Sequence, residues 1–189
     1  MIENITQIDF EILYWIQEHL KCAFLDAVMP FITHLGSSGI FWIILGFSFA
    51  FSKKYRKCGI NMLVGMLIGL IIGNMILKNA VMRERPCWIA DTVPMLIAIP
   101  KDYSFPSGHT TASVISALVI FHEDKKIGVI ALLIAILIAF SRMYLFVHFP
   151  TDILGGALLG TAIGVITPQL TEKFLSSRIS AVSPPPEQN

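Results

Sequence analysis

Long apolar runs, broken by short polar clusters, are the dominant pattern of this 189-residue chain. A membrane-spanning helix needs about 20 mostly apolar residues. Four runs meet or approach that length, and a fifth is shorter but apolar throughout. The four runs are residues 58–77, 108–121, 127–147 and 153–170, and the shorter one is 39–51. The pattern therefore predicts an all-α fold, a polytopic transmembrane bundle with five of its helices in these runs.

The first 35 residues follow a different, amphipathic pattern. Apolar residues recur at helical spacing, whereas the charged residues fall elsewhere on the helical wheel. The apolar set is Ile5, Ile8, Ile12, Leu13, Ile16 and Leu20, and the charged set is Glu11, Glu18 and Lys21. This helix either lies in the membrane interface or packs as a sixth helix, which gives five to six spanning helices. Residues 26–35 are too short to span alone and precede a break at Gly36-Ser-Ser-Gly39.

The composition is typical of a membrane protein and argues against a nucleic-acid partner. Hydrophobic residues make up 54% of the chain and charged residues only 14%, with a mean hydropathy of +0.70. A soluble domain usually carries about 25% charged residues. The net charge of +1 argues against a nucleic-acid partner, which needs a concentrated basic surface. Cys22, Cys58 and Cys87 lie far apart, so they indicate neither a metal site nor a disulfide framework.

Basic residues in the short loops predict the orientation, because they gather on the cytoplasmic side of a membrane. Eight fall on one side if the five helices alternate: Lys53, Lys54, Arg56, Lys57, Lys125, Lys126, Lys173 and Arg178. The opposite, extracytoplasmic side receives the loop 79–105 and the turn around His148.

Three segments follow from these patterns. Residues 1–35 form the amphipathic N-terminal segment, residues 36–175 the transmembrane core, and residues 176–189 a cytoplasmic tail. The tail ends in Ser183-Pro-Pro-Pro-Glu-Gln-Asn189, a composition that cannot bury a core and predicts disorder.

The first polar cluster is Lys78-Asn-Ala-Val-Met-Arg-Glu-Arg85-Pro86, at the end of an apolar run. Lys78 and Arg85 are two helical turns apart, so they share a face if the helix continues past the membrane edge. Pro86 then ends that helix. Arg83 falls on another face, where Glu84 is available to pair with it. One cation at a membrane edge is often an anchor, whereas two on one face are equally consistent with a ligand role.

The second cluster, Ser104-Phe-Pro106-Ser107-Gly108-His109, indicates a helix start with proline in the first turn. The N–H groups of Ser107, Gly108 and His109 are then unbonded and available to an anion. Glycine lets the backbone approach closely. The alternative is an ordinary capped helix.

The third cluster is Ser141-Arg142, followed by His148 and by Asp152 in the first turn of the last apolar run. Asp152 could reach back to His148, fix its tautomer and leave the other ring nitrogen free as a nucleophile. The alternative makes Asp152 a helix-start acid and His148 a residue of the membrane belt. Such charged groups at spanning segments by default mark function.

Together the clusters match the patterns K-x6-R-P, P-S-G-H and S-R-x5-H-x3-D in order and without departure. Over residues 36–170 the chain resembles the type 2 phosphatidic acid phosphatase superfamily, which also includes vanadium haloperoxidases. The resemblance implies that His148 attacks phosphorus and forms a phosphohistidine while Asp152 orients it. It implies that His109 protonates the leaving oxygen and later activates water. It also implies that the phosphoryl oxygens are held by Lys78, Arg85, Ser107, Gly108 and Arg142. The resemblance further implies that the reaction requires no metal or cofactor.

The residue chemistry is consistent with this resemblance. Phosphoryl transfer depends mostly on positioning and on stabilising charge on three equatorial oxygens, a task for which arginine forks are well suited. Two histidines that titrate near neutrality can act as nucleophile and acid. The remaining histidines, His19, His34 and His122, are interpreted as structural or solvated.

The patterns define the reaction class and leave the substrate open. The outer loop 87–103 contains Trp88 and an apolar run, and it either guides a lipid chain or covers the helix ends. By similarity to compact bacterial members, we expect a lipid phosphatase of the bacterial plasma membrane that converts undecaprenyl diphosphate to undecaprenyl phosphate. The alternative substrates are phosphatidylglycerophosphate and phosphatidic acid. A transporter is the alternative from another class, although its charges would lie at the midplane, and here they cluster at one end.

Overall fold

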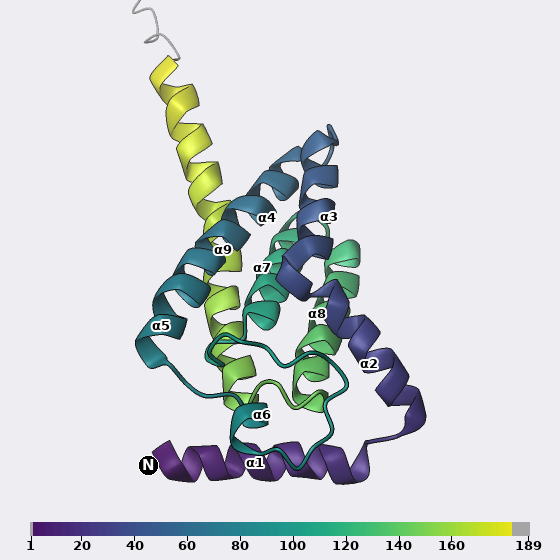
Figure 1. Cartoon of the computed structure of the whole chain (residues 1–189). Helices are drawn as coiled ribbons and strands as arrows, with labels where there is room; N and C mark the ends of the chain where they lie inside the picture. The colour runs from purple at the N-terminus through teal and green to yellow at the C-terminus, as the bar shows by residue number, and fades with distance from the viewer. Residues whose placement is uncertain (1, 183–189) are drawn as a thin grey trace, which may run out of the picture.

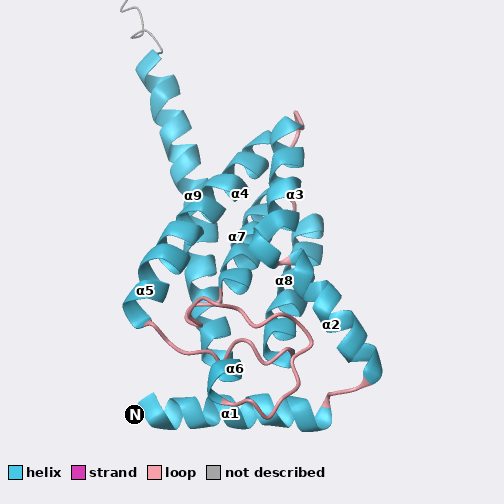
Figure 2. Ribbon diagram, viewed as in Figure 1, coloured by secondary structure: helices cyan, strands magenta, loops and turns pink. Residues whose placement is uncertain are grey.

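In a computed structural model the described part of the chain, residues 2–182, contains helices, turns and loops and no strand (Figure 2). Side chains are described for residues 5–37 and 39–173. The predicted all-α fold is confirmed. The helices are α1 (Ile2–His19), α2 (Ala23–Leu35), a one-turn 3-10 helix (Ser37–Gly39), α3 (Ile40–Phe51), α4 (Arg56–Gly69), a π-helix (Leu70–Leu77), α5 (Lys78–Val81), α6 (Pro86–Ile89), α7 (Gly108–Glu123), α8 (Lys125–Tyr144) and α9 (Pro150–Val182).

Three segments are long and apolar enough to cross a membrane: Arg56–Ile89, Lys125–Tyr144 and Pro150–Lys173. The pair α2 and α3, bent by 46° at the break between them, qualifies together as a fourth, broken span. Helix α7 has 16 residues, fewer than the about 20 that a spanning helix needs. The expected five to six spanning helices are therefore not confirmed, and the described residues provide three to four.

Helix α7 lies at the centre of the bundle, where it packs against α4, α8 and α9 (Figure 1). Its Ile115 is fully buried, and its Ser113 accepts a hydrogen bond from the Trp42 indole at 2.9 Å. Helix α8 approaches α7 closely, because a Cβ on Gly128 would lie 2.2 Å from the Cα of Phe121. Small residues at helix contacts are the usual means of close packing in membrane proteins.

Helix α1 lies across one end of the bundle, beside the loop that joins α6 to α7 (Figure 1). Leu13 and Ile16 of its apolar stripe are buried against the bundle. The outward face is also apolar and consists of Ile5, Ile8, Ile12 and Trp15, each more than 40% exposed. This placement favours the interfacial interpretation of the N-terminal helix over a sixth spanning helix.

The C-terminal helix is longer than the apolar run predicted. Helix α9 continues to Val182, so residues 176–182 of the expected tail are helical. Residues 183–189 of that tail lie outside the described residues.

Candidate active site

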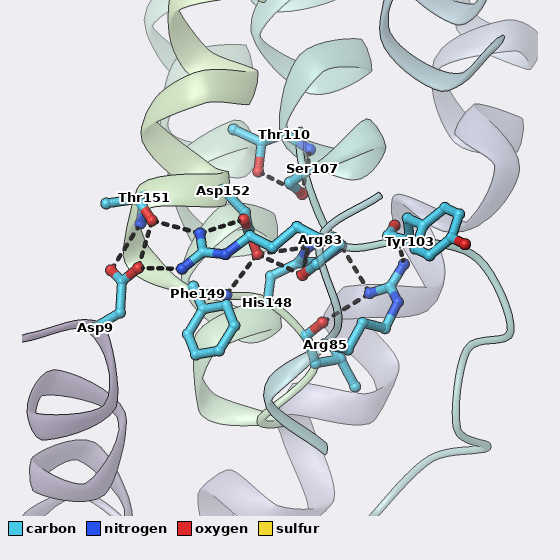
Figure 3. Close-up of polar contacts among 12 residues, drawn as sticks. Asp9, Arg83, Arg85, Tyr103, Ser107, Thr110, His148, Phe149, Thr151 and Asp152 are labelled. Atoms are coloured by element: carbon cyan, nitrogen blue, oxygen red, sulfur yellow. Dashed lines mark hydrogen bonds and ion pairs between the residues drawn. The ribbon is translucent and has the colours of Figure 1, made fainter. Parts of the chain in front are cut away.

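The three polar clusters meet at the end of the bundle that α1 crosses (Figure 3). Each side chain is placed by the end of a helix or by a turn between helices. Lys78 comes from α5, and Arg85 precedes α6. Ser107 caps α7, and Gly108 and His109 begin it. Arg142 is in the last turn of α8, His148 lies between α8 and α9, and Asp152 is in the first turn of α9. The structure therefore brings all eight predicted residues to one place.

A buried hydroxyl that the motifs did not include connects His148 to Asp152. His148 Nδ1 lies 3.5 Å from Asp152 Oδ2, longer than the usual hydrogen bond of about 2.7–3.2 Å. The Ser104 hydroxyl donates to Asp152 Oδ2 at 2.5 Å and lies 3.3 Å from His148 Nδ1. The backbone N–H of Phe149 donates to the same carboxylate oxygen at 2.8 Å. Ser104 therefore joins carboxylate and imidazole on the Nδ1 side of the ring.

The other ring nitrogen of His148 faces a cation. Arg85 Nη1 lies 3.1 Å from His148 Nε2 and donates to the Val147 carbonyl at 2.7 Å. Burial, and then the positive charges of Arg85, Arg142 and Lys78, hold the pKa of His148 well below its ordinary value. The imidazole is therefore neutral near pH 7, and its Nε2 lone pair, which a nucleophile would use, accepts a hydrogen bond from Arg85.

The chain between Lys78 and Arg85 is not the continuous helix that the spacing predicted. The helix ends at Val81, Met82 adopts a left-handed conformation with φ of 47°, and Arg85 is extended. A proline disfavours helical geometry in the residue before it, so Pro86 begins α6 rather than ending a helix. Lys78 and Arg85 reach the site from separate elements.

Both cations bind Asp102, a residue of the loop between α6 and α7. Lys78 Nζ bonds Asp102 Oδ2, and Arg85 Nη2 bonds Asp102 Oδ1 at 2.9 Å. Burial alone would raise the pKa of Asp102, but the Lys78 ammonium and the Arg85 guanidinium outweigh it and lower that pKa to about 2. The Asp102 side chain is 57% exposed. A phosphate that binds these cations must displace this accessible carboxylate.

The start of α7 is a capped helix that still presents free N–H groups. Ser107 is the N-cap, and its hydroxyl accepts from the Thr110 N–H at 3.4 Å. Its own N–H donates to the Asp152 carbonyl at 3.1 Å, so Ser107 is not the free donor that the sequence predicted. Within the described residues, the N–H groups of Gly108 and His109 have no acceptor. These two donors, at the positive end of the helix dipole, suit an anion.

Two side-chain atoms at the site are buried without a partner among the described residues, His109 Nε2 and Arg142 Nε. The Arg142 guanidinium is otherwise held by Thr33 of α2, whose hydroxyl accepts from Nη1 at 2.6 Å. The His109 ring fits because Gly36 has no Cβ, which would lie 2.7 Å from the ring. Unpartnered buried donors are uncommon in proteins, and a bound phosphate would supply the acceptors that are missing.

These groups line one end of a cavity of about 860 Å³. Six of the eight predicted residues contribute to its lining, whereas Ser107 and Asp152 do not: Lys78, Arg85, Gly108, His109, Arg142 and His148 line it. The rest of the lining is mainly apolar and comes from α3, α4, the π-helix and α7: Ile43, Leu63, Met66, Leu67, Leu70 and Ile115. Leu67 and Leu70 are also about half exposed on the outside of the bundle. The cavity therefore combines cations with apolar side chains that remain partly exposed.

Arg83 lies beside the site, and the expectation that Glu84 pairs with it is wrong. Instead of Glu84, which is exposed, it binds Asp9 of α1 and Asp152 of α9. Sequence reasoning missed the role of Asp9. Its position in the sequence could have revealed it. Asp9 lies four residues after Ile5 and four residues before Leu13, so an acid interrupts the apolar stripe of an amphipathic helix.

Histidines and cations around one cavity, in a helical bundle with segments long enough to span a membrane, suit a phosphatase that acts on lipids. The family model for the PAP2 superfamily matches residues 59–176. The chain belongs to this superfamily of lipid phosphatases, which confirms the resemblance inferred from the three motifs.

Named relatives and solved structures agree with this assignment. Phosphatidylglycerophosphatase B of Bacillus subtilis is 34% identical over 171 residues, covering 82% of this chain and 79% of the relative. Undecaprenyl-diphosphatase of Sulfolobus acidocaldarius is 28% identical over 159 residues, covering 84% and 76%. The crystal structure of a PAP2-type phosphatidylglycerolphosphate phosphatase from Bacillus subtilis superimposes with a TM-score of 0.74 at 30% identity, covering 90% and 87%. That of Aquifex aeolicus LpxE gives 0.73 at 29% identity, covering 85% and 94%.

Proposed function

We propose that this protein hydrolyses undecaprenyl diphosphate to undecaprenyl phosphate at the extracytoplasmic face of a bacterial plasma membrane. The observation that carries the proposal is one cavity that is lined both by two histidines and three cations of the motifs and by apolar side chains. A phosphate group attached to a long apolar chain matches both parts. The Sulfolobus relative named undecaprenyl-diphosphatase, which covers 84% of this chain, supports the choice of substrate.

In the proposed reaction, His148 Nε2 attacks the terminal phosphorus and the bond from phosphorus to the leaving oxygen breaks. Burial and then the Arg142 guanidinium lower the pKa of His109 to about 2, so His109 does not titrate near neutrality as the sequence predicted. The negative charge of a bound phosphate raises that pKa, and His109 takes up a proton with the substrate and gives it to the leaving oxygen, so that a phosphohistidine remains. His109 then takes a proton from water, whose oxygen attacks the phosphohistidine, and inorganic phosphate leaves while His148 is restored. Lys78, Arg85 and Arg142 stabilise the charge on the equatorial oxygens. Asp102 must first leave Lys78 and Arg85.

Phosphatidylglycerophosphate is the second candidate substrate. The Bacillus relative named phosphatidylglycerophosphatase B shares more identical residues with this chain than the Sulfolobus relative does, 34% against 28%. This lipid also combines a phosphate with apolar chains, so the cavity accommodates its chemistry equally.

An assay of the purified protein separates the candidates. Phosphate release should have the highest kcat/KM with undecaprenyl diphosphate, compared with phosphatidylglycerophosphate, phosphatidic acid and an aryl phosphate. A higher value for phosphatidylglycerophosphate would replace the first candidate by the second, and release from no lipid would refute both. A chelator should leave the rate unchanged, because protein cations supply the charge stabilisation. Loss of activity that magnesium restores would contradict that expectation.

The proposed orientation follows from the position of the basic residues. The Tyr55 hydroxyl bonds Asp124 Oδ2 at 3.2 Å, so the loop between α3 and α4 lies beside the loop between α7 and α8. These loops carry Lys53, Lys54, Lys125 and neighbouring basic residues, and they lie at the end of the bundle away from α1 (Figure 1). By the positive-inside rule this end is cytoplasmic and the site is extracytoplasmic.

Thiol labelling in intact cells tests this orientation. In a variant whose Cys22 and Cys87 are replaced by alanine, a cysteine at Lys101 should react with an impermeant reagent added outside. A cysteine at Lys125 should react only after permeabilisation. The reversed pattern would place the site in the cytoplasm and favour a phospholipid of the inner leaflet as substrate.

A further inference from the structure

Arg83 joins two buried carboxylates from opposite ends of the chain (Figure 3). Its Nη2 binds Asp9 Oδ2 at 2.7 Å and its Nη1 binds Asp152 Oδ1 at 2.8 Å. Asp9 is 1% exposed and Asp152 is fully buried. The guanidinium also lies over the Phe149 ring, 4.1 Å from its centroid. One rigid fork therefore connects helix α1 to the carboxylate beside His148.

Further contacts fix α1 to the turn that carries His148. Asp9 Oδ1 accepts from the Thr151 N–H at 3.1 Å, and Asp9 Oδ2 accepts from the Thr151 hydroxyl. The Phe10 ring meets the Phe149 ring edge-on, with centroids 5.0 Å apart. The side-chain amide of Gln17 donates to the Tyr144 carbonyl at 2.7 Å. These contacts flank the turn on both sides.

We infer that Asp9 and Arg83 position Asp152. Helix α1, which carries Asp9, therefore contributes a positioning residue to the active site. The Ser104 hydroxyl and the Phe149 N–H donate to Asp152 Oδ2. The Arg83 guanidinium donates to Oδ1 and also balances the negative charge of the carboxylate. A buried carboxylate needs such a partner. Asp9 in turn neutralises part of the positive charge of Arg83. Asp152 therefore keeps enough negative charge to act as a strong hydrogen-bond acceptor for Ser104 and His148. This inference rests on the nucleophilic role proposed for His148 and not on which lipid is the substrate.

The charges of Asp9 and Arg83 should each shift the pKa of His148, and the shift should be visible in the pH profile of the reaction. The groups that surround His148 are Asp152, Arg85, Lys78, Arg142, Asp102 and His109. Asp152 and the pair behind it, Asp9 and Arg83, together carry a net charge of −1. Removing the Asp9 charge makes this set neutral and lowers the pKa of His148, whereas removing the Arg83 charge makes it −2 and raises that pKa. Because attack needs neutral His148, the acid limb of kcat/KM follows its pKa.

The test uses the full-length protein with an aryl phosphate, whose hydrolysis does not depend on lipid identity. Asp9→Asn should lower kcat about tenfold, equivalent to about 1.4 kcal/mol, with KM nearly unchanged. Its acid limb should move to lower pH by on the order of half a unit. Arg83→Gln should lower kcat similarly and move the limb to higher pH. The double variant should return the limb to the wild-type pH while kcat stays low.

Glu18→Gln is the matched control, because Glu18 is an exposed acid on the same helix. It should match the wild type in rate and profile. An Asp9→Asn protein with wild-type kcat would overturn the inference. A lower kcat with an unmoved acid limb in both single variants, together with a lower unfolding temperature, would reduce the pair to a structural role. Failure of every lipid in the substrate assay would refute the proposed substrate and leave this test intact.

Discussion

Replacing His148 by alanine should abolish phosphate release from lipid phosphates and from aryl phosphates. The variant lacks the nitrogen that would bond to phosphorus, and the remaining cations can only bind the substrate. By comparison with other enzymes that lose a nucleophile, we expect kcat to fall by at least about a thousandfold. Initial rates of phosphate release, measured with both substrate types, check this prediction.

His122→Ala is the matched control for this variant. His122 is exposed in the last turn of α7, at the opposite end of that helix from His109, so its loss should leave the rate unchanged. Thermal unfolding of the His148→Ala protein should show that it is still folded. A folded His148→Ala protein with nearly wild-type activity would refute the phosphohistidine mechanism.

The sequence contained enough information for the all-α class of fold and for the proximity of the eight predicted residues. Apolar runs predicted the helices, and the three motifs predicted eight residues that the structure brings together. This succeeded because each motif marks a helix end, as at Ser107 or Asp152, and helix ends follow from local rules for proline, glycine and capping residues.

The sequence did not reveal the contacts that join distant segments. Asp9 and Asp152 share Arg83 although 143 positions separate them in the chain, and no local periodicity encodes such a pairing. Ser104 and Asp102 belong to an irregular loop, whose path depends on the helices it connects. The helix does not continue from Lys78 to Arg85, because Pro86 holds the residue before it in an extended conformation whatever the two-turn spacing.

Span counting failed for a related reason. An apolar run does not always correspond to one span, since α2 and α3 qualify only together, as a bent pair, and α7 is short. Helix α7 lies inside the bundle, where α4, α8 and α9 surround it. The length that lipid requires of a spanning helix is not required of a helix that other helices cover.

His109→Gln should separate the two proton transfers proposed for that histidine, because they differ in their dependence on the leaving group. An alcohol leaves poorly without a proton, so kcat with a lipid monophosphate should fall by about 10²–10⁴. A phenol with a pKa of about 10 leaves more readily, so an aryl phosphate should still transfer its phosphoryl group to His148. Hydrolysis of the phosphohistidine then lacks its base. The aryl phosphate should therefore give a burst of one equivalent of phenol followed by slow turnover.

Rapid-mixing measurements of phenol and phosphate release test this prediction, and glutamine keeps much of the volume that the His109 ring fills beside Gly36. Phenol should appear in the burst without an equal amount of phosphate, because the phosphoryl group remains on His148. The lipid monophosphate should give no burst, since its first step is the slow one. Equal losses with both substrates and no burst with either would argue that His109 binds phosphate without transferring a proton. In that case the buried, unpartnered Nε2 would be a phosphate ligand beside Arg142.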